Sequence, residues 1–183
     1  METSNLYVYK ALDAFPYDLE QTMESLNYAL AYEPENVQAL FLMGRVHSEL
    51  LGLYPEAIAY FQAALTSNVE FQKLYPYYVD ALIKNEDFTQ AKTFLDFAVT
   101  VKGADKPVLT YFNGVLLEQS GAFKQAIKTF KVAKKLALNG NYVSFMESQI
   151  SRVKAKLPKK KKAKKKRKRN KKKNKAKHKK KGD

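Results

Sequence analysis

The chain has 183 residues, of which 45% are apolar and 13% aromatic, and it contains no cysteine. Such a composition allows one folded domain with a hydrophobic core, and it excludes disulfides and thiolate metal sites. No apolar run approaches the roughly 18 residues that span a bilayer, and the acidic, polar start of the chain is unlike a secretory signal. We therefore expect a soluble protein of the cytoplasm, or of the nucleus if the source is eukaryotic.

The net charge of +15 is concentrated at the C-terminal end of the chain. Residues 158–183 hold 18 Lys/Arg residues and one acid, whereas residues 1–157 have a net charge of −2. Within the larger part, residues 1–70 carry 10 acids and two bases, and residues 71–157 carry seven acids and 13 bases. The sequence thus predicts a nearly neutral folded domain over 1–157 and a separate polybasic tail over 158–183.

Apolar periodicity, prolines and turn residues predict nine helices. Their expected ranges are 4–14, 17–32, 36–51, 55–67, 75–85, 88–102, 107–120, 122–138 and 141–156. Asn36 is suited to an N-cap, and Pro55 and Pro107 are suited to the first turn of a helix. We expect the two end helices to close the domain with apolar residues. These residues are Leu6, Tyr9, Leu12 and Phe15 at the N-terminal end and Val143, Met146 and Ile150 at the other end.

Three segments of the chain share one pattern, in which an aromatic residue is followed by alanines three and ten positions later. The copies are Tyr54/Ala57/Ala64, Phe88/Ala91/Ala98 and Phe123/Ala126/Ala133, and an earlier, weaker copy is Leu19/Thr22/Leu26/Ala29. A bulky residue lies four positions after the first alanine of each copy: Phe61, Leu95 or Phe130. From copy to copy, the first alanine recurs after 34 and then 35 residues. This spacing places the alanines and the bulky residue on one helical stripe, where small side chains let a second helix approach.

Glycines mark two further positions of the pattern. Gly44 and Gly114 lie on the preceding helices, and Gly52 and Gly121 lie in the turns, where a positive φ is common. With the period, the alanines and the turn aromatics, these glycines resemble the tetratricopeptide repeat family over about residues 17–138. The resemblance implies an all-α fold, a right-handed α-solenoid of antiparallel helix pairs. It would have about three and a half repeats, a C-terminal capping helix and then the disordered basic tail.

The chain departs from the family pattern at two places on the first helices. The interval from Gly44 to Gly52 is one residue longer than usual, and the third copy has Val79 where the family has glycine. The same helix of the third copy also has Pro76 near its start.

By resemblance, the first helices of the repeats line a concave groove that binds a protein or peptide. The corresponding residues here are Gln38, Phe41, Arg45, Ser48, Glu49, Lys73, Asp80, Lys84, Tyr111, Val115, Glu118 and Gln119. Phe41 and Tyr111 are expected either to anchor a partner or to pack on neighbouring helices. Some family members hold a C-terminal carboxylate with Lys and Asn side chains in the groove. Because Phe41 and Arg45 occupy two of those positions, we do not expect that activity.

The sequence contains no motif for catalysis, for a cofactor or for a metal, since it lacks Walker-type, HExxH and GxSxG elements. Of its two histidines, His47 falls at a helix-packing position of the repeat and His178 lies among the lysines of the tail. We therefore expect a protein that is not an enzyme and that has no cofactor, metal ion or small-molecule substrate.

The polybasic tail lacks residues that could build a core, and its like charges oppose helix formation. We expect it to bind polyanions without sequence preference by displacing counterions from phosphates, because it offers no aromatic side chain for base stacking. The residues expected to do so are Lys159, Lys160, Lys161, Lys162, Lys164, Lys165, Lys166, Arg167, Lys168, Arg169, Lys171, Lys172 and Lys173. Four lysines on one helical face, Lys124, Lys128, Lys131 and Lys135, form either a solvated surface or an extension of the tail.

We interpret the chain as a non-enzymatic scaffold that binds a protein or peptide in its groove and is held near nucleic acid, RNA or ribosomes above all, by its tail. One alternative is a protein-interaction adaptor whose tail serves only targeting or solubility. Another is a regulatory subunit that acts on an active site in a different protein. Attachment of the tail to anionic lipid would be weak, because the tail has no apolar anchor.

Overall fold

The computed structural model of the chain describes residues 3–158, and helices make up most of that range. The α-helices are α1 (Thr3–Ala14), α2 (Leu19–Tyr32), α3 (Val37–Arg45), α4 (Tyr54–Ser67), α5 (Tyr75–Lys84), α6 (Phe88–Ala98), α7 (Lys106–Gln119), α8 (Phe123–Leu136) and α9 (Gly140–Lys156). A π-helical turn, η1 (Val46–Leu51), follows α3, and a 3₁₀ turn, η2 (Gln72–Leu74), precedes α5. Each predicted helix is present, although the one predicted over 88–102 ends early, at Ala98.

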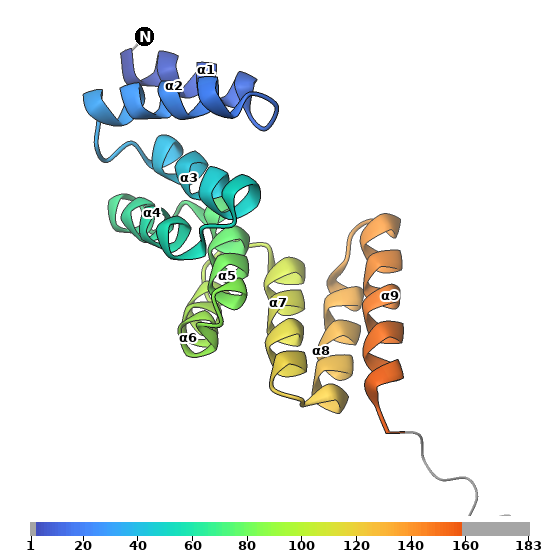
Figure 1. The fold of residues 1–183 in the computed structure, drawn as a ribbon. Helices are drawn as coiled ribbons and strands as arrows, with labels where there is room; N and C mark the ends of the chain where they lie inside the picture. The colour runs from blue at the N-terminus through green and yellow to red at the C-terminus, as the bar shows by residue number, and fades with distance from the viewer. Residues whose placement is uncertain (1–2, 159–183) are drawn as a thin grey trace, which may run out of the picture.

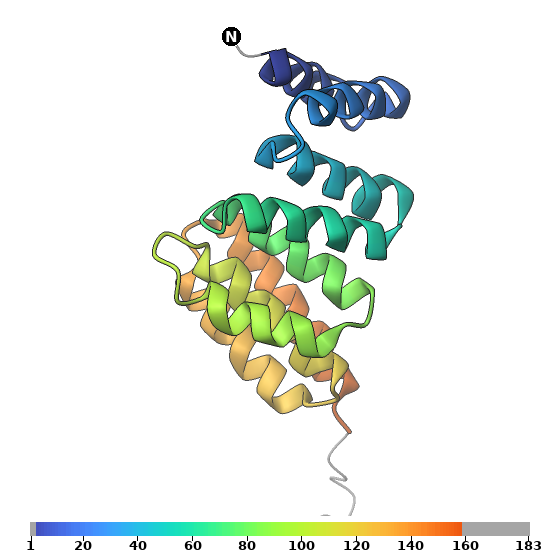
Figure 2. The same ribbon diagram turned by 90° about the vertical axis from the view of Figure 1, so that its left-hand side faces the viewer.

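The helices pack as antiparallel pairs that follow one another along the chain (Figure 1). Contacts join α1 to α2, α3 to α4, α5 to α6 and α7 to α8, and α9 packs on α8. Successive pairs are rotated relative to one another, so that the described part of the chain forms a right-handed α-solenoid (Figures 1 and 2). The half repeat expected near the N-terminus is completed by α1, which pairs with α2.

Polar side chains at the N-caps define where four of the helices begin. Asp18, Asn36, Asp105 and Asn139 each accept a hydrogen bond from the backbone N–H three residues later, at 2.8–3.1 Å. Such a bond pairs one of the N–H groups that the first turn leaves without a helical partner. The predicted N-cap at Asn36 is therefore confirmed, as is the placement of Pro55 and Pro107 in the first turns of α4 and α7.

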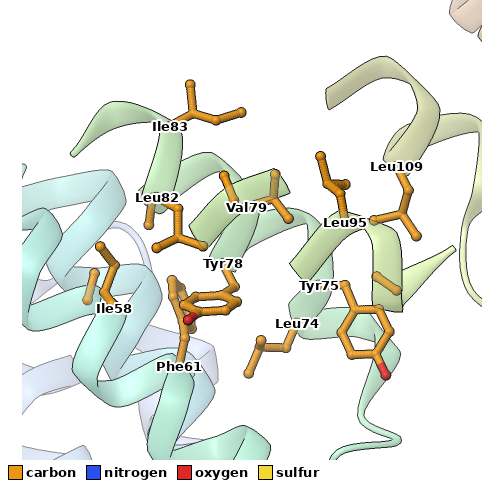
Figure 3. Packing of buried hydrophobic residues seen from close by; sticks show 14 of the residues in the cluster. Ile58, Phe61, Leu74, Tyr75, Tyr78, Val79, Leu82, Ile83, Leu95 and Leu109 are labelled. Carbon is orange, nitrogen blue, oxygen red and sulfur yellow. The ribbon is translucent and has the colours of Figure 1, made fainter. Parts of the chain in front are cut away.

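The alanine stripe of the repeat forms the contact between the two helices of each pair. All six alanines of the three copies are 0% exposed, Phe61 and Phe130 are also 0% exposed, and Leu95 is 2% exposed. Phe61 and Leu95 belong to the central core cluster, where they lie among side chains of α5 (Figure 3). The helical register predicted from the sequence is thus confirmed in all three copies.

The glycines of the first helices explain why the third copy can have valine instead. A Cβ atom at Gly114 would lie 2.5 Å from Cε1 of Phe130, and one at Gly44 would overlap the ring of Phe61 in the same way. In the third copy Val79 takes the glycine position and Leu95 takes the phenylalanine position, and both are buried in one cluster (Figure 3). A larger residue on one helix is thus matched by a smaller one on the other, which keeps the packing dense.

The extra residue between Gly44 and Gly52 is accommodated by the π-helical turn η1. A π-helical turn makes i→i+5 hydrogen bonds and so holds one more residue than an α-helical turn. The last of these bonds runs from the backbone N–H of Gly52 to the carbonyl oxygen of His47. The predicted helix over 36–51 therefore continues to its expected end, but its last turn is wider.

The turns inside the three repeats reach the same backbone conformation with different residues. Gly52 and Gly121 have φ angles of 67° and 75°, as the pattern predicts. In the third copy the equivalent position is Glu86, with φ of 62°. A side chain with a Cβ atom is strained in this left-handed region, so this turn carries a cost that glycine avoids.

The N-terminal helix buries a different face from the one expected. In α1 the buried residues are Val8 and Ala11, whereas Leu6, Tyr9 and Leu12 are 42–52% exposed. The expectation that these three residues close the N-terminal end is therefore wrong, because α1 packs on α2 through its smaller side chains. At the other end, Met146 and Ile150 of α9 are buried as predicted. No helix within residues 3–158 is long and apolar enough to cross a membrane.

Candidate protein-binding groove

Most of the predicted groove residues lie on α3, α5 and α7, the first helices of the last three pairs, and the rest lie in η1 and η2. These helices follow one another along one side of the solenoid (Figures 1 and 2), and α5 contacts α7 directly. We call the side of α3, α5 and α7 that α4, α6 and α8 leave uncovered the inner face. The structure thus places these helices on one side of the solenoid, although Phe41, Ser48 and Glu118 are buried there. Gln119 lies at the edge of this side, where it lines a surface cavity together with Phe88 and Lys92 of α6.

Arg45 occupies the centre of the N-terminal part of the inner face. Its guanidinium carbon lies 4.5 Å from the ring centre of Phe15 and 4.9 Å from that of Tyr77, which comes from α5. Its nitrogens also donate two hydrogen bonds to the carboxylate of Glu49, at 2.7 and 3.0 Å, and these bonds raise the pKa of Arg45. Arg45 therefore links the α1–α2 turn to α5 while its charge is neutralised.

Phe41 lies beneath this cluster and is 5% exposed. Its ring packs at 5.2–5.4 Å from the rings of Phe71 and Tyr77 and at 6.3 Å from that of Phe61. Of the two roles that the sequence allowed for Phe41, the structure has packing on neighbouring helices. Phe41 is therefore not an exposed anchor, because the rings of Phe61, Phe71 and Tyr77 cover it.

Lys84 and Asp80 form the next charged pair along the inner face, on α5. The ammonium nitrogen of Lys84 lies 2.8 Å from a carboxylate oxygen of Asp80. This hydrogen bond, together with the nearby charges of Asp80 and Glu49, raises the pKa of Lys84. The pair is 41–44% exposed, so it is screened by water and contributes little to stability. Lys84 is nevertheless close enough to Glu49 of η1 for the two charges to attract each other.

Glu118 is the most buried charge of the inner face, with 7% of its surface exposed. Two cations of α9 bind its carboxylate: the guanidinium of Arg152 at 2.5 and 2.6 Å, and the ammonium of Lys156 at 2.7 Å. Burial alone would raise the pKa of Glu118, but these hydrogen bonds outweigh it and hold the pKa below its ordinary value. Glu118 thus fixes α9 against α7 and is not offered to a partner.

The repeat pattern did not identify Arg152 and Lys156 as partners of Glu118. Their signal in the sequence was the spacing of four residues, which puts both cations on one face of α9. The same helix is held at its start by the hydroxyl of Tyr142, which donates to the carbonyl oxygen of Pro107 at 3.0 Å. Burial raises the pKa of Tyr142 to about 12. The capping helix is thus attached to α7 at both of its ends.

Tyr111 of α7 is half-buried. Its ring packs on Phe112, Phe130 and Phe145 at 5.1–5.8 Å. Burial is the main cause that raises the pKa of Tyr111, and the negative charge of Asp80 adds to it. The ring therefore lies between the charged pair of α5 and the ion pair that holds α9.

The remaining predicted residues divide by exposure. Gln38, Lys73 and Gln119 are exposed, and Val115 is half-buried. Ser48 is 7% exposed, and its hydroxyl donates to the carbonyl oxygen of Arg45, so it lies under the surface. His47, expected to serve packing, is 9% exposed with its Nδ1 atom 2.9 Å from the carbonyl oxygen of Met43.

The inner face offers hydrogen-bonding groups and apolar contacts to a partner, but its charges largely cancel one another. Each of its carboxylates (Glu49, Asp80 and Glu118) already has a cation beside it. No group of three or more His, Cys, Asp or Glu side chains within residues 3–158 could hold a metal ion. The predicted polyanion-binding residues, 159–173, lie outside the described residues.

Comparison with known proteins agrees with this architecture. A family model described as tetratricopeptide repeat matches residues 23–76, from within α2 to the start of α5. The search of curated protein sequences gave no match.

Several solved structures share the fold over most of the chain. PilW, described as a widely conserved type IV pilus biogenesis factor, has a TM-score of 0.69 and 16% identity over 84% of this chain and 71% of its own. PilF of Pseudomonas aeruginosa has a TM-score of 0.68 and 18% identity over 84% of this chain and 69% of its own. MamA of Desulfovibrio magneticus RS-1 has a TM-score of 0.65 and 19% identity over 85% of this chain and 89% of its own. At these identities the likeness shows the fold alone.

Proposed function

We propose that the chain, which has the fold of tetratricopeptide repeat proteins and matches that family model over residues 23–76, is a non-enzymatic scaffold that binds a segment of a partner protein on its inner face. Proteins of this family generally act as scaffolds for protein–protein contacts. We also propose that the polybasic tail holds the scaffold near nucleic acid, with RNA or ribosomes as the main target. We further propose that the protein acts in the cytoplasm, or in the nucleus of a eukaryote.

The observation that carries the groove proposal is that the first helices α3 and α7 carry exposed amide side chains and one half-buried tyrosine. Gln38 and Gln119 are exposed, and Tyr111 keeps part of its ring open. Amide and phenol groups can pair with the backbone of an extended peptide, and the ring can cover an apolar side chain. Because the nearby charges are paired within the protein, we expect such binding to depend only weakly on salt.

The tail proposal is supported by the charge of +17 over residues 158–183. Binding of such a segment to phosphates releases counterions and therefore weakens steeply as salt increases. The two proposed interactions thus differ in one measurable property. A partner on the inner face should remain bound at high salt, whereas nucleic acid should be released.

Affinity purification of the full chain tests both proposals. We expect a protein partner to remain after nuclease treatment and a wash at high salt, and nucleic acid to be lost in that wash. Replacing Gln38 and Gln119 together by arginine should displace the partner, because bulky charges would then occupy the inner face. The matched control replaces Ala63 and Thr93, which are exposed on α4 and α6, by arginine. Equal partner recovery from both variants would place the binding surface elsewhere.

The alternative adaptor, in which the tail serves only targeting or solubility, gives a different result. In that case the protein partner would co-purify at a fixed ratio, but no nucleic acid would co-purify even at low salt. A regulatory subunit would co-purify with an enzyme and change its activity when added back. Each outcome is read from the same purification.

A further inference from the structure

Four lysines form an exposed row along α8 that has no counter-charge. Lys124, Lys128, Lys131 and Lys135 are all exposed, and α8 contains no acidic residue. None of the ion pairs within residues 3–158 involves any of the four, whereas Lys134, on the side of α8 toward α9, is paired with Glu147. On other helices, cations such as Lys84 and Lys92 are paired with an acid one turn away. This row is therefore a concentrated positive surface.

The spacing within the row opposes the stability of α8 rather than supporting it. Lys124 and Lys128, and likewise Lys131 and Lys135, are separated by four residues, and like charges at this spacing repel each other on a helix. The row also covers no core surface, since the buried side of α8 is formed by Ala126, Ile127, Phe130 and Ala133. Binding of an anion would relieve the repulsion, so the row is better explained as a binding surface than as part of the fold.

The row is continuous with the start of the polybasic tail. Lys124 and Lys128 line one surface cavity together with Leu157 and Pro158, the last described residues. Pro158 therefore lies beside the N-terminal end of α8. Figure 1 shows α8 beside α9. A polyanion held by the tail is thus brought to the lysine row without any change in the domain.

The geometry of the row fits a nucleic-acid backbone. Eleven residues of helix rise about 16 Å, so the four ammonium groups lie along a straight line of roughly that length. One strand of a duplex advances about 3.4 Å per phosphate, and the row can therefore follow about four or five consecutive phosphates. The row contains no aromatic residue, which excludes stacking on bases as its mode of contact.

A lipid surface fits the row less well. A helix that lies in a membrane interface inserts its wide apolar side into the lipid. In α8 that side is already buried in the solenoid, and only Val132 and Leu136 remain partly exposed, at 49% and 41%. We propose that the lysine row of α8 binds the phosphate backbone of nucleic acid without reading its sequence. This inference rests on the proposed role of the tail.

The test compares two full-length variants that lose the same charge. The first replaces Lys124, Lys128, Lys131 and Lys135 by glutamine. The control replaces Lys10, Lys92, Lys102 and Lys106, which are exposed outside α8, by glutamine. Fluorescence anisotropy with a 20-base-pair duplex and with single-stranded RNA gives the affinity at several salt concentrations. We expect the slope of log K against log salt to fall by about 2–4 for the α8 variant on the duplex. Its affinity near 0.1 M salt should fall roughly 10²–10⁴-fold, with the control close to wild type.

Each other outcome overturns a defined part of the account. Wild-type protein that binds neither nucleic acid would refute the proposed role of the tail, and the inference with it. Equal slopes for the two variants would show that the tail acts alone and would overturn the inference only. Loss of binding to phosphatidylserine vesicles, with nucleic-acid binding unchanged, would show that the row serves a lipid surface. An Arg variant at all four positions should bind like wild type, because the charge is retained.

Discussion

Exchange of the residue pair Gly114 and Phe130 for the pair found in the third repeat tests how the helix pairs are packed. Gly114→Val alone adds a Cβ atom that would lie 2.5 Å from Cε1 and 2.7 Å from Cδ1 of Phe130, a ring that is 0% exposed and cannot move outward. Such overpacking costs about 1–3 kcal/mol of stability. Phe130→Leu alone leaves part of the ring space empty and should cost about 1–2 kcal/mol, below the 3–5 kcal/mol of a change to alanine.

The double variant should be more stable than the sum of the single changes predicts. Val79 and Leu95 occupy these positions in the third repeat, so the combination fits the same backbone there. We expect a favourable coupling free energy of about 1–3 kcal/mol. Urea denaturation followed by circular dichroism at 222 nm gives the four stabilities of the cycle. Additive effects within about 0.5 kcal/mol, or a Gly114→Val variant as stable as wild type, would refute the matched-pair explanation.

Three further changes test other parts of the account. Glu86→Gly should stabilise the protein by about 1 kcal/mol and raise Tm by roughly 2–4 °C, because glycine adopts the left-handed φ without strain. A lower Tm in calorimetry would show that the Glu86 side chain stabilises the fold by more than its backbone strain costs. Ala126→Leu should destabilise by about 1–3 kcal/mol in urea denaturation, whereas Lys128→Leu on the exposed side should have little effect; equal midpoints for Ala126→Leu and wild type would contradict the helical register. Glu118→Gln should cost about 1–2 kcal/mol at pH 7, because its two cations are half-exposed and can turn to water. Since the folded-state pKa of Glu118 lies below its unfolded value, its contribution is present above the unfolded pKa and is lost as pH falls through the folded pKa. Wild type should therefore lose more stability than the glutamine variant on acidification below about pH 4.5, and parallel pH curves would disprove the role of the ion pair.

The repeat pattern predicted the second helices well because their buried positions are set by local spacing. Ala57, Phe61 and Ala64 lie on one stripe of a single helix, so their burial follows from helical periodicity alone. The same applies to the equivalent residues of α6 and α8. An N-cap such as Asn36 is also a local feature, and it was found for the same reason.

The inner face was harder to predict because its contacts join residues far apart in the chain. Arg45 lies between Phe15 and Tyr77, and Glu118 is bound by cations 34 and 38 positions later. These contacts depend on how successive helix pairs are rotated relative to one another, and the sequence of a single helix does not determine that rotation. The exposure of Leu6, Tyr9 and Leu12 was missed for a related reason, since a helix at the end of a solenoid has a neighbour on one side only.

The most direct test of the central claim is to locate the partner on the surface of the scaffold. A photo-crosslinking amino acid at Gln38 or Gln119 lies on the proposed inner face, and one at Ala63 or Thr93 lies on the exposed side of α4 or α6. Crosslinking in the cells that make the protein, followed by nuclease treatment and denaturing electrophoresis, compares the four positions. The account predicts the same discrete crosslinked protein from both inner positions and from neither outer position. Crosslinks from Ala63 or Thr93 with none from Gln38 and Gln119 would contradict it.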